Sequence, residues 1–115
     1  MTYPDRMEND SLSHIDWPQF TDLKFSQPDP VKFPCLLLAM EAGKEGGTCP
    51  AVLCAADEVA VDLFLNRRIG FTGIPRLVEA VLNKHSNNTH PDIDDIKEAD
   101  RWAREQALEI AGRKV

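Results

Sequence analysis

The chain lacks an excess of basic residues, and this excludes one large class of partner. Its 13 lysines and arginines are outnumbered by 19 acidic residues, which gives a formal net charge of −6. Such a chain repels a polyanion. Its densest basic site, Arg67-Arg68, is too small to follow a nucleic-acid backbone. We therefore expect no nucleic-acid partner.

Long apolar runs and paired cysteines are also missing. A membrane-spanning helix needs roughly 18–20 apolar residues, and the apolar stretch 36–40 is far too short. The first residues show neither the charged nor the apolar segment of a secretory signal. The three cysteines are odd in number and have no CxxC spacing, which is typical of reduced thiols. These features predict a cytoplasmic protein without membrane contact.

Glycine is scarce, and no phosphate-binding loop is present. The six glycines form no GxGxxG pattern, the strand-to-helix turn that brings backbone N–H groups to a dinucleotide. The glycines between 43 and 47 instead predict a turn between two helices. We therefore expect no cofactor-binding residue and no NADPH affinity in this chain.

An acidic cluster late in the chain is a candidate metal site. A calcium loop needs alternating oxygen ligands around a central glycine, which is absent here. Acidic side chains at the start of a helix also stabilise its positive end. We prefer this second interpretation and expect no metal ligand. The cluster comprises Asp92, Asp94, Asp95, Glu98 and Asp100.

The cysteines and histidines do not have the spacing of a zinc site. Structural zinc needs paired ligands a few residues apart, as in a CxxC or HxxxH pattern. Cys49 and Cys54 are five residues apart, and so are His85 and His90, which are separated by a loop. Acidic neighbours raise the pKa of a thiol and oppose its use as a nucleophile. Because Cys54 precedes two acidic residues, we expect it to be packed rather than reactive.

Other conspicuous side chains suggest no chemistry. The sequence around His14 offers no obvious acid or base partner for it. Cys35 is expected to lie on a packed helix face. Trp17 and Trp102 are expected to be packing anchors. No catalytic residue is predicted anywhere in the chain.

The first 33 residues are predicted to form an extended linker arm. Each proline biases its predecessor toward extended backbone, and five of the eight prolines lie within the first 34 residues. Sparse, bulky apolar residues such as Trp17 and Phe20 suggest an arm pinned to another surface. Leu23 and Phe25 share one face at a period of two, so residues 23–26 are suited to add a strand to another sheet.

Residues 34–115 are predicted to form a small four-helix bundle, which makes the fold class all-α. The first helix should span about 34–42, with Gly43 as its stop. It is apolar on several faces and is therefore expected to be covered on several sides. The second should begin at Thr48 as N-cap and end near Asn66, a residue suited to left-handed backbone.

Two further helices complete the predicted bundle. Thr72 is a suitable cap for the third, and Asp92 or Asp94 should open the fourth. Apolar residues at helical spacing mark the buried faces of the second, third and fourth helices. They are Val52, Ala56, Val59, Ala60 and Leu63; Ile74, Leu77, Val78, Val81 and His85; and Ile96, Ala99, Ala103, Ala107 and Ile110. The bundle should fold without metal or nucleotide.

Several ordered segments resemble the C-terminal part of the 1-deoxy-D-xylulose 5-phosphate reductoisomerase family. They include Phe33-Pro-Cys-Leu36, Pro50-Ala-Val-Leu53, Glu58-Val-Ala-Val61 and Ile69-Gly-Phe71. The resemblance covers nearly the whole chain, most specifically residues 29–75. It implies an enzyme of non-mevalonate isoprenoid biosynthesis that uses NADPH and a divalent metal. The family's nucleotide, metal and substrate residues lie upstream of this part, so no active-site residue can be assigned here.

The chain departs from the family pattern at three positions. The family usually has Asn where Cys54 and Asp57 stand, and Lys where Leu37 stands. The resemblance implies a non-catalytic structural domain that supports a catalytic core absent from this chain. The alternative is a free-standing helical interaction module derived from that domain.

Leu37 also suggests self-association. It adds an exposed leucine to the first helix, and apolar residues of the arm lack the core that they would normally lie against. We expect a two-fold dimer with the first helix and residues 12–33 at the contact. The alternative is an arm that folds back over its own bundle and leaves Leu37 as a lone exposed leucine.

Overall fold

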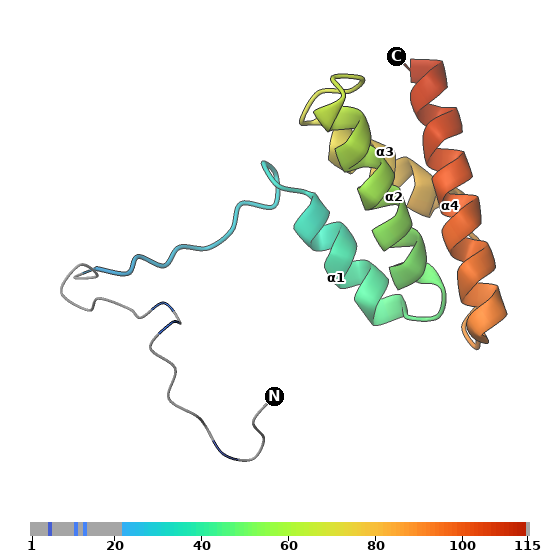
Figure 1. Cartoon of the computed structure of the whole chain (residues 1–115), viewed down its shortest axis with the longest axis horizontal. Coiled ribbons are helices and arrows are strands. Elements are labelled where there is room, and N and C mark those ends of the chain that lie inside the picture. The colour runs from blue at the N-terminus through green and yellow to red at the C-terminus, as the bar shows by residue number, and fades with distance from the viewer. Residues whose placement is uncertain (1–4, 6–10, 12, 14–21, 115) are drawn as a thin grey trace.

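The computed structural model describes residues 5, 11, 13 and 22–114 of the 115-residue chain. It contains four helices, α1 (Cys35–Glu45), α2 (Cys49–Leu65), α3 (Gly73–Lys84) and α4 (Ile93–Lys114) (Figure 1). No strand occurs among the described residues. The predicted all-α four-helix bundle is therefore confirmed. None of the helices in the described part is both long and apolar enough to cross a bilayer.

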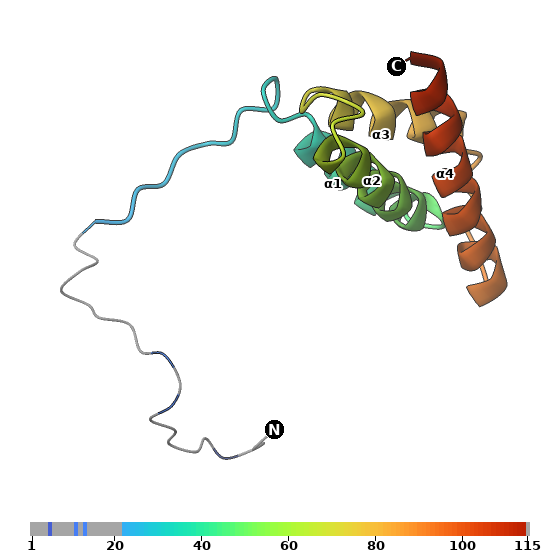
Figure 2. The same ribbon diagram turned by 45° about the horizontal axis from the view of Figure 1, so that its top comes forward.

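Helix α2 occupies the centre of the bundle. It packs against α1, α3 and α4, and α3 also contacts α4 and, less extensively, α1. Within the described residues α1 and α4 do not contact each other and lie on opposite sides of α2 (Figure 2). The outer face of α1 is consequently left without a helix to cover it.

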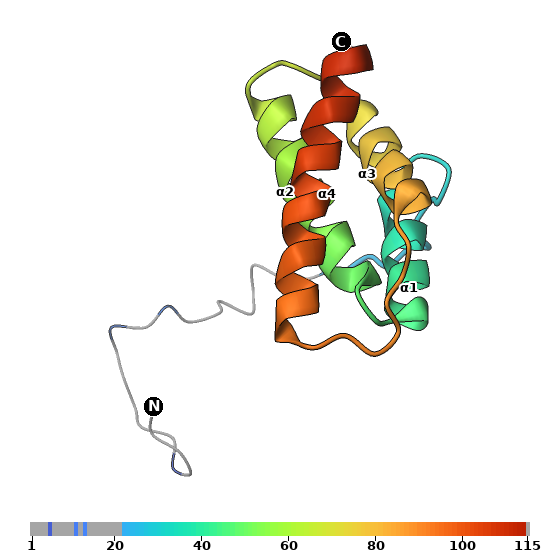
Figure 3. The ribbon, with the colours of Figure 1, turned by 90° about the vertical axis from the view of Figure 1, so that its right-hand side faces the viewer.

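The core is built largely from small side chains. Ala55, Ala56 and Ala60 of α2 and Ala103 and Ala107 of α4 are fully buried. Residues without bulky side chains let two helix backbones approach closely, and the contact between α2 and α4 is the most extensive in the bundle (Figure 3). Larger buried residues from α2 and α3 fill the remaining space, namely Val52, Leu63, Ile74, Leu77, Val78 and Val81.

The predicted core stripes are confirmed except at three residues, one of which is the half-buried His85. Val59 is only half-buried, although it packs against the core cluster. Ile96 is 39% exposed, so its placement in the core was wrong. It lies in the first turn of α4, where this helix extends past the beginning of α2 (Figure 3).

The predicted end of the first helix was wrong, whereas the predicted N-cap positions of the next two helices are confirmed without side-chain caps. Helix α1 continues through Gly43 to Glu45 and stops at Gly46, whose φ of 65° is accessible to glycine at little cost. Thr48 and Thr72 occupy the N-cap positions of α2 and α3, but neither side chain caps its helix. Both residues have helical backbone angles, whereas a capping side chain requires an extended N-cap residue.

The end of α2 also differs from the prediction. Arg67, not Asn66, adopts left-handed backbone, with a φ of 60°. The Arg68 N–H donates to the Leu63 carbonyl over 2.8 Å, and the Arg67 N–H donates to the Phe64 carbonyl over 3.0 Å. This pair of bonds is the Schellman motif, in which glycine usually takes the left-handed position. An arginine therefore stands where the backbone favours glycine.

The predicted start of α4 is confirmed at Asp92. The Asp92 carboxylate accepts a hydrogen bond of 2.8 Å from the Asp95 N–H, and the Asp95 carboxylate accepts one of 3.2 Å from the Asp92 N–H. This reciprocal arrangement satisfies two backbone donors at the start of the helix.

Candidate functional site

The outer surface of α1 is an apolar feature that the bundle leaves uncovered. Leu36, Leu37 and Met40 on α1, together with Phe33 just before it, are each about half exposed. We call these four residues the α1 face. The expectation that this helix is covered on several sides was wrong within this chain, because α1 packs mainly against α2 and buries only Ala42 completely.

The described part of the arm is equally uncovered. Residues 22–28 have neither helical nor strand structure, and the side chains of Leu23 and Phe25 are largely exposed. Figure 1 shows this segment leading away from the bundle. The suggestion that residues 23–26 add a strand to another sheet stays a prediction, as does the division of the chain at residue 33. His14, Trp17 and Phe20 lie outside the described residues.

A polar cluster joins the two loops at one end of the bundle. The buried Thr48 hydroxyl accepts a hydrogen bond of 3.1 Å from the Asn88 N–H and lies 2.7 Å from Nε2 of His85. The Thr48 N–H donates to the Asn87 side-chain carbonyl over 3.0 Å. Thr48 thus links the α1–α2 turn to the α3–α4 loop instead of capping its own helix.

Gly47 makes this junction sterically possible. Its φ is 61°, and a Cβ added there would lie 2.2 Å from the Asn88 carbonyl oxygen. The two loops touch through their backbones at this point, so no other residue fits without displacement.

His85 is held mainly by packing. Its ring lies 5.4 Å from that of Trp102, measured between centroids, which confirms Trp102 as a packing residue. Burial lowers the pKa of His85, while the carboxylate of Glu45 partly opposes this shift. A neutral ring at physiological pH suits a structural contact. A hollow of about 390 Å³ lies beside His85, and the carboxylates of Asp95 and Glu98 line it. Both carboxylates already have partners, because Asp95 caps α4 and Glu98 pairs with Arg101.

The acidic cluster is spread along the first turns of α4 and the residue before it. No group of three or more potential ligands lies together in the part of the chain that the structure describes. Asp92 and Asp95 cap α4, Asp94 is exposed in its first turn, and Asp100 pairs with Arg104 over 3.0 Å. The interpretation of this cluster as the acidic start of a helix is therefore confirmed for Asp92 and Asp95.

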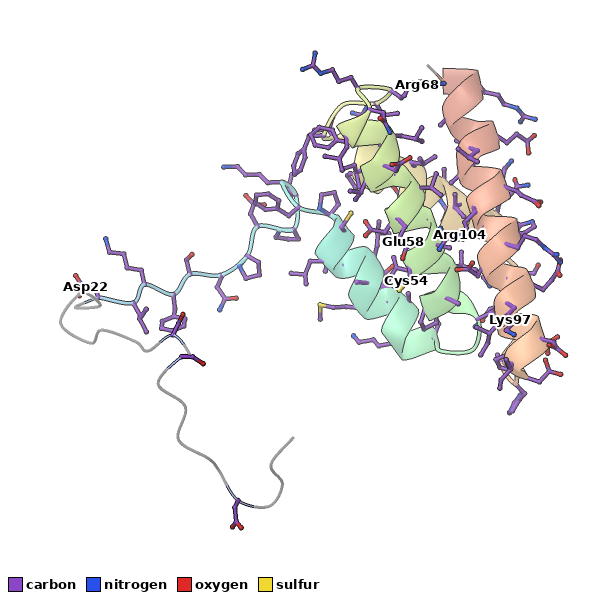
Figure 4. The ribbon with its side chains drawn as sticks, viewed as in Figure 1. Asp22, Cys54, Glu58, Arg68, Lys97 and Arg104 are labelled. Atoms are coloured by element: carbon purple, nitrogen blue, oxygen red, sulfur yellow. The ribbon has the colours of Figure 1, made fainter. Side chains whose placement is uncertain are left out.

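The three cysteines are free and differ in environment. Cys49 donates a hydrogen bond of 3.1 Å from Sγ to the Glu45 carboxylate. Burial is the main cause that raises the pKa of this thiol to about 11, and the hydrogen bond to Glu45 is the second. Burial, with a smaller contribution from Asp57, raises the pKa of Cys35. Cys54 is exposed, so the expectation that it is packed was wrong. It lies on the α2 surface one turn before Glu58, which pairs with Arg104 over 2.7 Å (Figure 4).

The exposed apolar surface of α1 is the clearest candidate for contacts with a partner. His85 packs on Trp102 and lies near enough to Glu45 for this carboxylate to affect its pKa, whereas His90 contacts Thr89. The α1 face could not be recognised from the sequence as exposed, because its leucines follow the same pattern that marks a buried helix. Its only signal was Leu37, which stands where the resembling family usually has lysine.

Comparisons with known proteins identify the domain. Residues 1–106 match the family described as DXP reductoisomerase C-terminal domain. The 1-deoxy-D-xylulose 5-phosphate reductoisomerase of Acetivibrio thermocellus is 50% identical over 110 residues, which cover 96% of this chain and 29% of that protein. The enzyme of Halothermothrix orenii is 43% identical over 113 residues, covering 98% of this chain and 29% of the relative.

A solved structure shows the same architecture. The chain superposes on 1-deoxy-D-xylulose 5-phosphate reductoisomerase from Zymomonas mobilis, determined in complex with NADPH, with a TM-score of 0.85 and 38% sequence identity. The match covers 95% of this chain and 29% of that chain. The chain therefore spans less than a third of the length of the relatives that it matches.

Proposed function

Because this chain belongs to the family of the DXP reductoisomerase C-terminal domain, we propose that it is the helical domain supporting the catalytic core of a 1-deoxy-D-xylulose 5-phosphate reductoisomerase. The observation that carries this proposal is 50% identity over 96% of the chain, confined to 29% of a relative of that name. Such similarity does not favour the alternative of a free-standing interaction module.

The chemistry is assigned to the core and not to residues 1–115. The resembling family uses NADPH and a divalent metal in non-mevalonate isoprenoid biosynthesis. This chain has no glycine-rich phosphate loop, and its candidate acidic ligands serve as helix caps and ion-pair partners. We propose that the chain alone is inactive, that the core holds both cofactors, and that the enzyme acts in the cytoplasm.

Two different partners are proposed for the two uncovered apolar surfaces. Leu23 and Phe25 of the arm are suited to lie against the core, since both are largely exposed and share one face of an extended segment. The α1 face carries Leu37 where the family usually has lysine, which indicates a surface that the core leaves free. We propose that a second copy of the chain covers this face.

A chimeric enzyme tests the proposed support role. In the Acetivibrio thermocellus relative, the region matching this chain is replaced by residues 1–115, and NADPH oxidation is compared with that of the truncated relative. We expect the chimera to be active and the truncated protein to be inactive. A Leu23→Asp, Phe25→Asp chimera should lose activity while keeping its helical circular dichroism signal. An inactive but folded parent chimera would contradict the proposal.

A further inference from the structure

Three arginines gather where α2 ends and α3 begins. Arg67 and Arg68 lie in the connection between these helices, and Arg76 lies in the first turn of α3. Figure 4 shows Arg68 at the opposite end of the bundle from Lys97. We call the surface formed by Arg67, Arg68 and Arg76 the arginine end.

Among the arginines that the structure describes, these three form no ion pair. The ion pairs found among the described residues use Arg101, Arg104 and Arg113, all on α4. None involves the arginine end, whose three side chains are exposed. In a chain with a net charge of −6, three cations without an ion pair form a distinct positive surface, with Glu79 as the carboxylate that lines a hollow together with Arg76.

The backbone at Arg67 supplies an independent reason to regard this surface as functional. Arg67 has a φ of 60° at a position where a Schellman motif favours glycine. A side chain in left-handed backbone lowers stability relative to glycine. Unfavourable backbone of this kind persists mainly where the residue has a use. Nothing in the packing requires an arginine, because its side chain is exposed.

A hollow of about 580 Å³ lies beside these cations. Arg68 and Arg76 line it together with apolar residues from α3, α4 and the α2–α3 connection, including Ile69, Leu77 and Ile110. A simple inorganic anion would pair with the arginines but leave this apolar lining uncovered. The hollow therefore matches a ligand that has both carboxylates and an apolar side chain.

Exposed apolar residues at the two ends of the α2–α3 connection favour a protein as that ligand, and one of them, Phe71, lines a second hollow together with Arg76. Leu65 at the end of α2 and Phe71 just before α3 are both exposed. Arginines and aromatic residues around an apolar pocket are typical of the energetically important centre of protein interfaces. The acidic remainder of the chain would repel the long phosphate backbone of a nucleic acid or an anionic membrane.

We propose that the arginine end docks an acidic protein segment in which carboxylates flank an apolar side chain. The carboxylates pair with Arg67, Arg68 and Arg76, and the apolar side chain enters the hollow. This interaction surface adjoins the α1 face at a second hollow, which Phe33 and Arg76 line together. The proposal does not rest on the proposed catalytic core.

Titration of the full chain with a hexapeptide tests the proposal. The peptide has two acidic residues on each side of a Phe-Leu pair, and binding is followed by the amide shifts of the isotopically labelled protein. We expect shifts centred on residues 66–77 and 110–111, and weaker binding as salt rises from about 0.05 to about 0.5 M. Two control peptides carry either amides instead of the acids or serines instead of the Phe-Leu pair, and both should bind more weakly.

Variants separate the arginines from the general charge of the protein. Arg67→Gly, Arg68→Ser and Arg76→Ser should each weaken binding by about threefold or more, whereas Lys97→Ser makes the same charge change at the other end and should have no effect. Arg67→Gly is the most informative variant, because glycine suits the backbone there and loss of binding cannot come from unfolding. Unchanged affinity in all three arginine variants would overturn the proposal. Shifts centred on the α1 face, or equally tight binding of duplex DNA or anionic vesicles at the arginine end, would also overturn it.

Discussion

Replacing Leu37 by lysine tests whether the α1 face joins two copies of the chain. The exposed fractions of this face are 55% for Phe33, 42% for Leu36, 46% for Leu37 and 50% for Met40. Complete burial of such a side chain contributes about 1.5–3 kcal/mol. Because roughly half of each is already buried, a partner would add about 0.7–1.5 kcal/mol for each side chain.

These values predict a weak dimer. A two-fold contact buries the four residues of the α1 face on both copies, so the total gain is about 6–12 kcal/mol. Association costs on the order of 4–15 kcal/mol in lost translational and rotational freedom. The gain exceeds this cost by at most about 8 kcal/mol, so the Kd should be about 1 μM or weaker. Concentrated wild-type protein should therefore dimerise, and dilute protein should be monomeric.

Leu37→Lys should abolish this dimer over the same concentration range. The substitution removes two leucine contributions from a two-fold contact and places two like charges close together, which weakens association by at least about tenfold. Sedimentation equilibrium over a range of concentrations measures the effect. The matched control is Leu108→Lys on α4, where the leucine is 57% exposed but lies on a helix that does not contact α1. A wild-type monomer at all concentrations, or an unchanged dimer in Leu37→Lys, refutes the reasoning.

Further predictions concern stability. Arg67→Gly should raise the free energy of unfolding by about 1 kcal/mol in urea denaturation, because it relieves left-handed backbone; Asn66→Gly, where φ is −87°, should bring no such gain. Ala103→Leu should lower stability by about 1–3 kcal/mol, since Ala103 is fully buried where α2 meets α4, whereas the exposed Glu105→Leu should be nearly neutral. Burial lowers the pKa of His85, so the unfolded chain takes up a proton near pH 6.5 that the folded chain resists. The contribution of neutral His85 to the free energy of unfolding should therefore be fully present above about pH 6.5. It should decrease as the pH falls through the lowered pKa of the folded state. His85→Gln should remove this part of the pH dependence, and an identical pH profile would contradict the assignment. Addition of a chelator should leave the helical circular dichroism signal and the melting temperature unchanged, because the acids at the start of α4 cap a helix; melting caused by the chelator would show that a metal holds the bundle.

The sequence by itself determined the helices and the family. Apolar residues that recur about every 3.6 residues predicted α2, α3 and α4 and most of their buried positions, because this periodicity is a local property of the chain. Asp92 was recognisable as the start of α4 because its capping partner Asp95 is only three residues away. Ordered segments such as Ile69-Gly-Phe71 indicated the family, and the comparisons confirmed it.

Only the tertiary structure decided which surfaces are covered. The leucines of α1 follow a pattern typical of a buried helix, yet half of their area is exposed because α4 lies on the other side of α2. Thr48 has the sequence context of a helix cap, but its hydroxyl contacts His85 and Asn88, about forty residues away along the chain. The same holds for the arginine end, where residues 68 and 76 border a hollow completed by Ile110. Packing between segments that are distant in the sequence determines which helix faces are covered and by which neighbour. The periodicity of apolar residues along the chain contains no information about these long-range contacts.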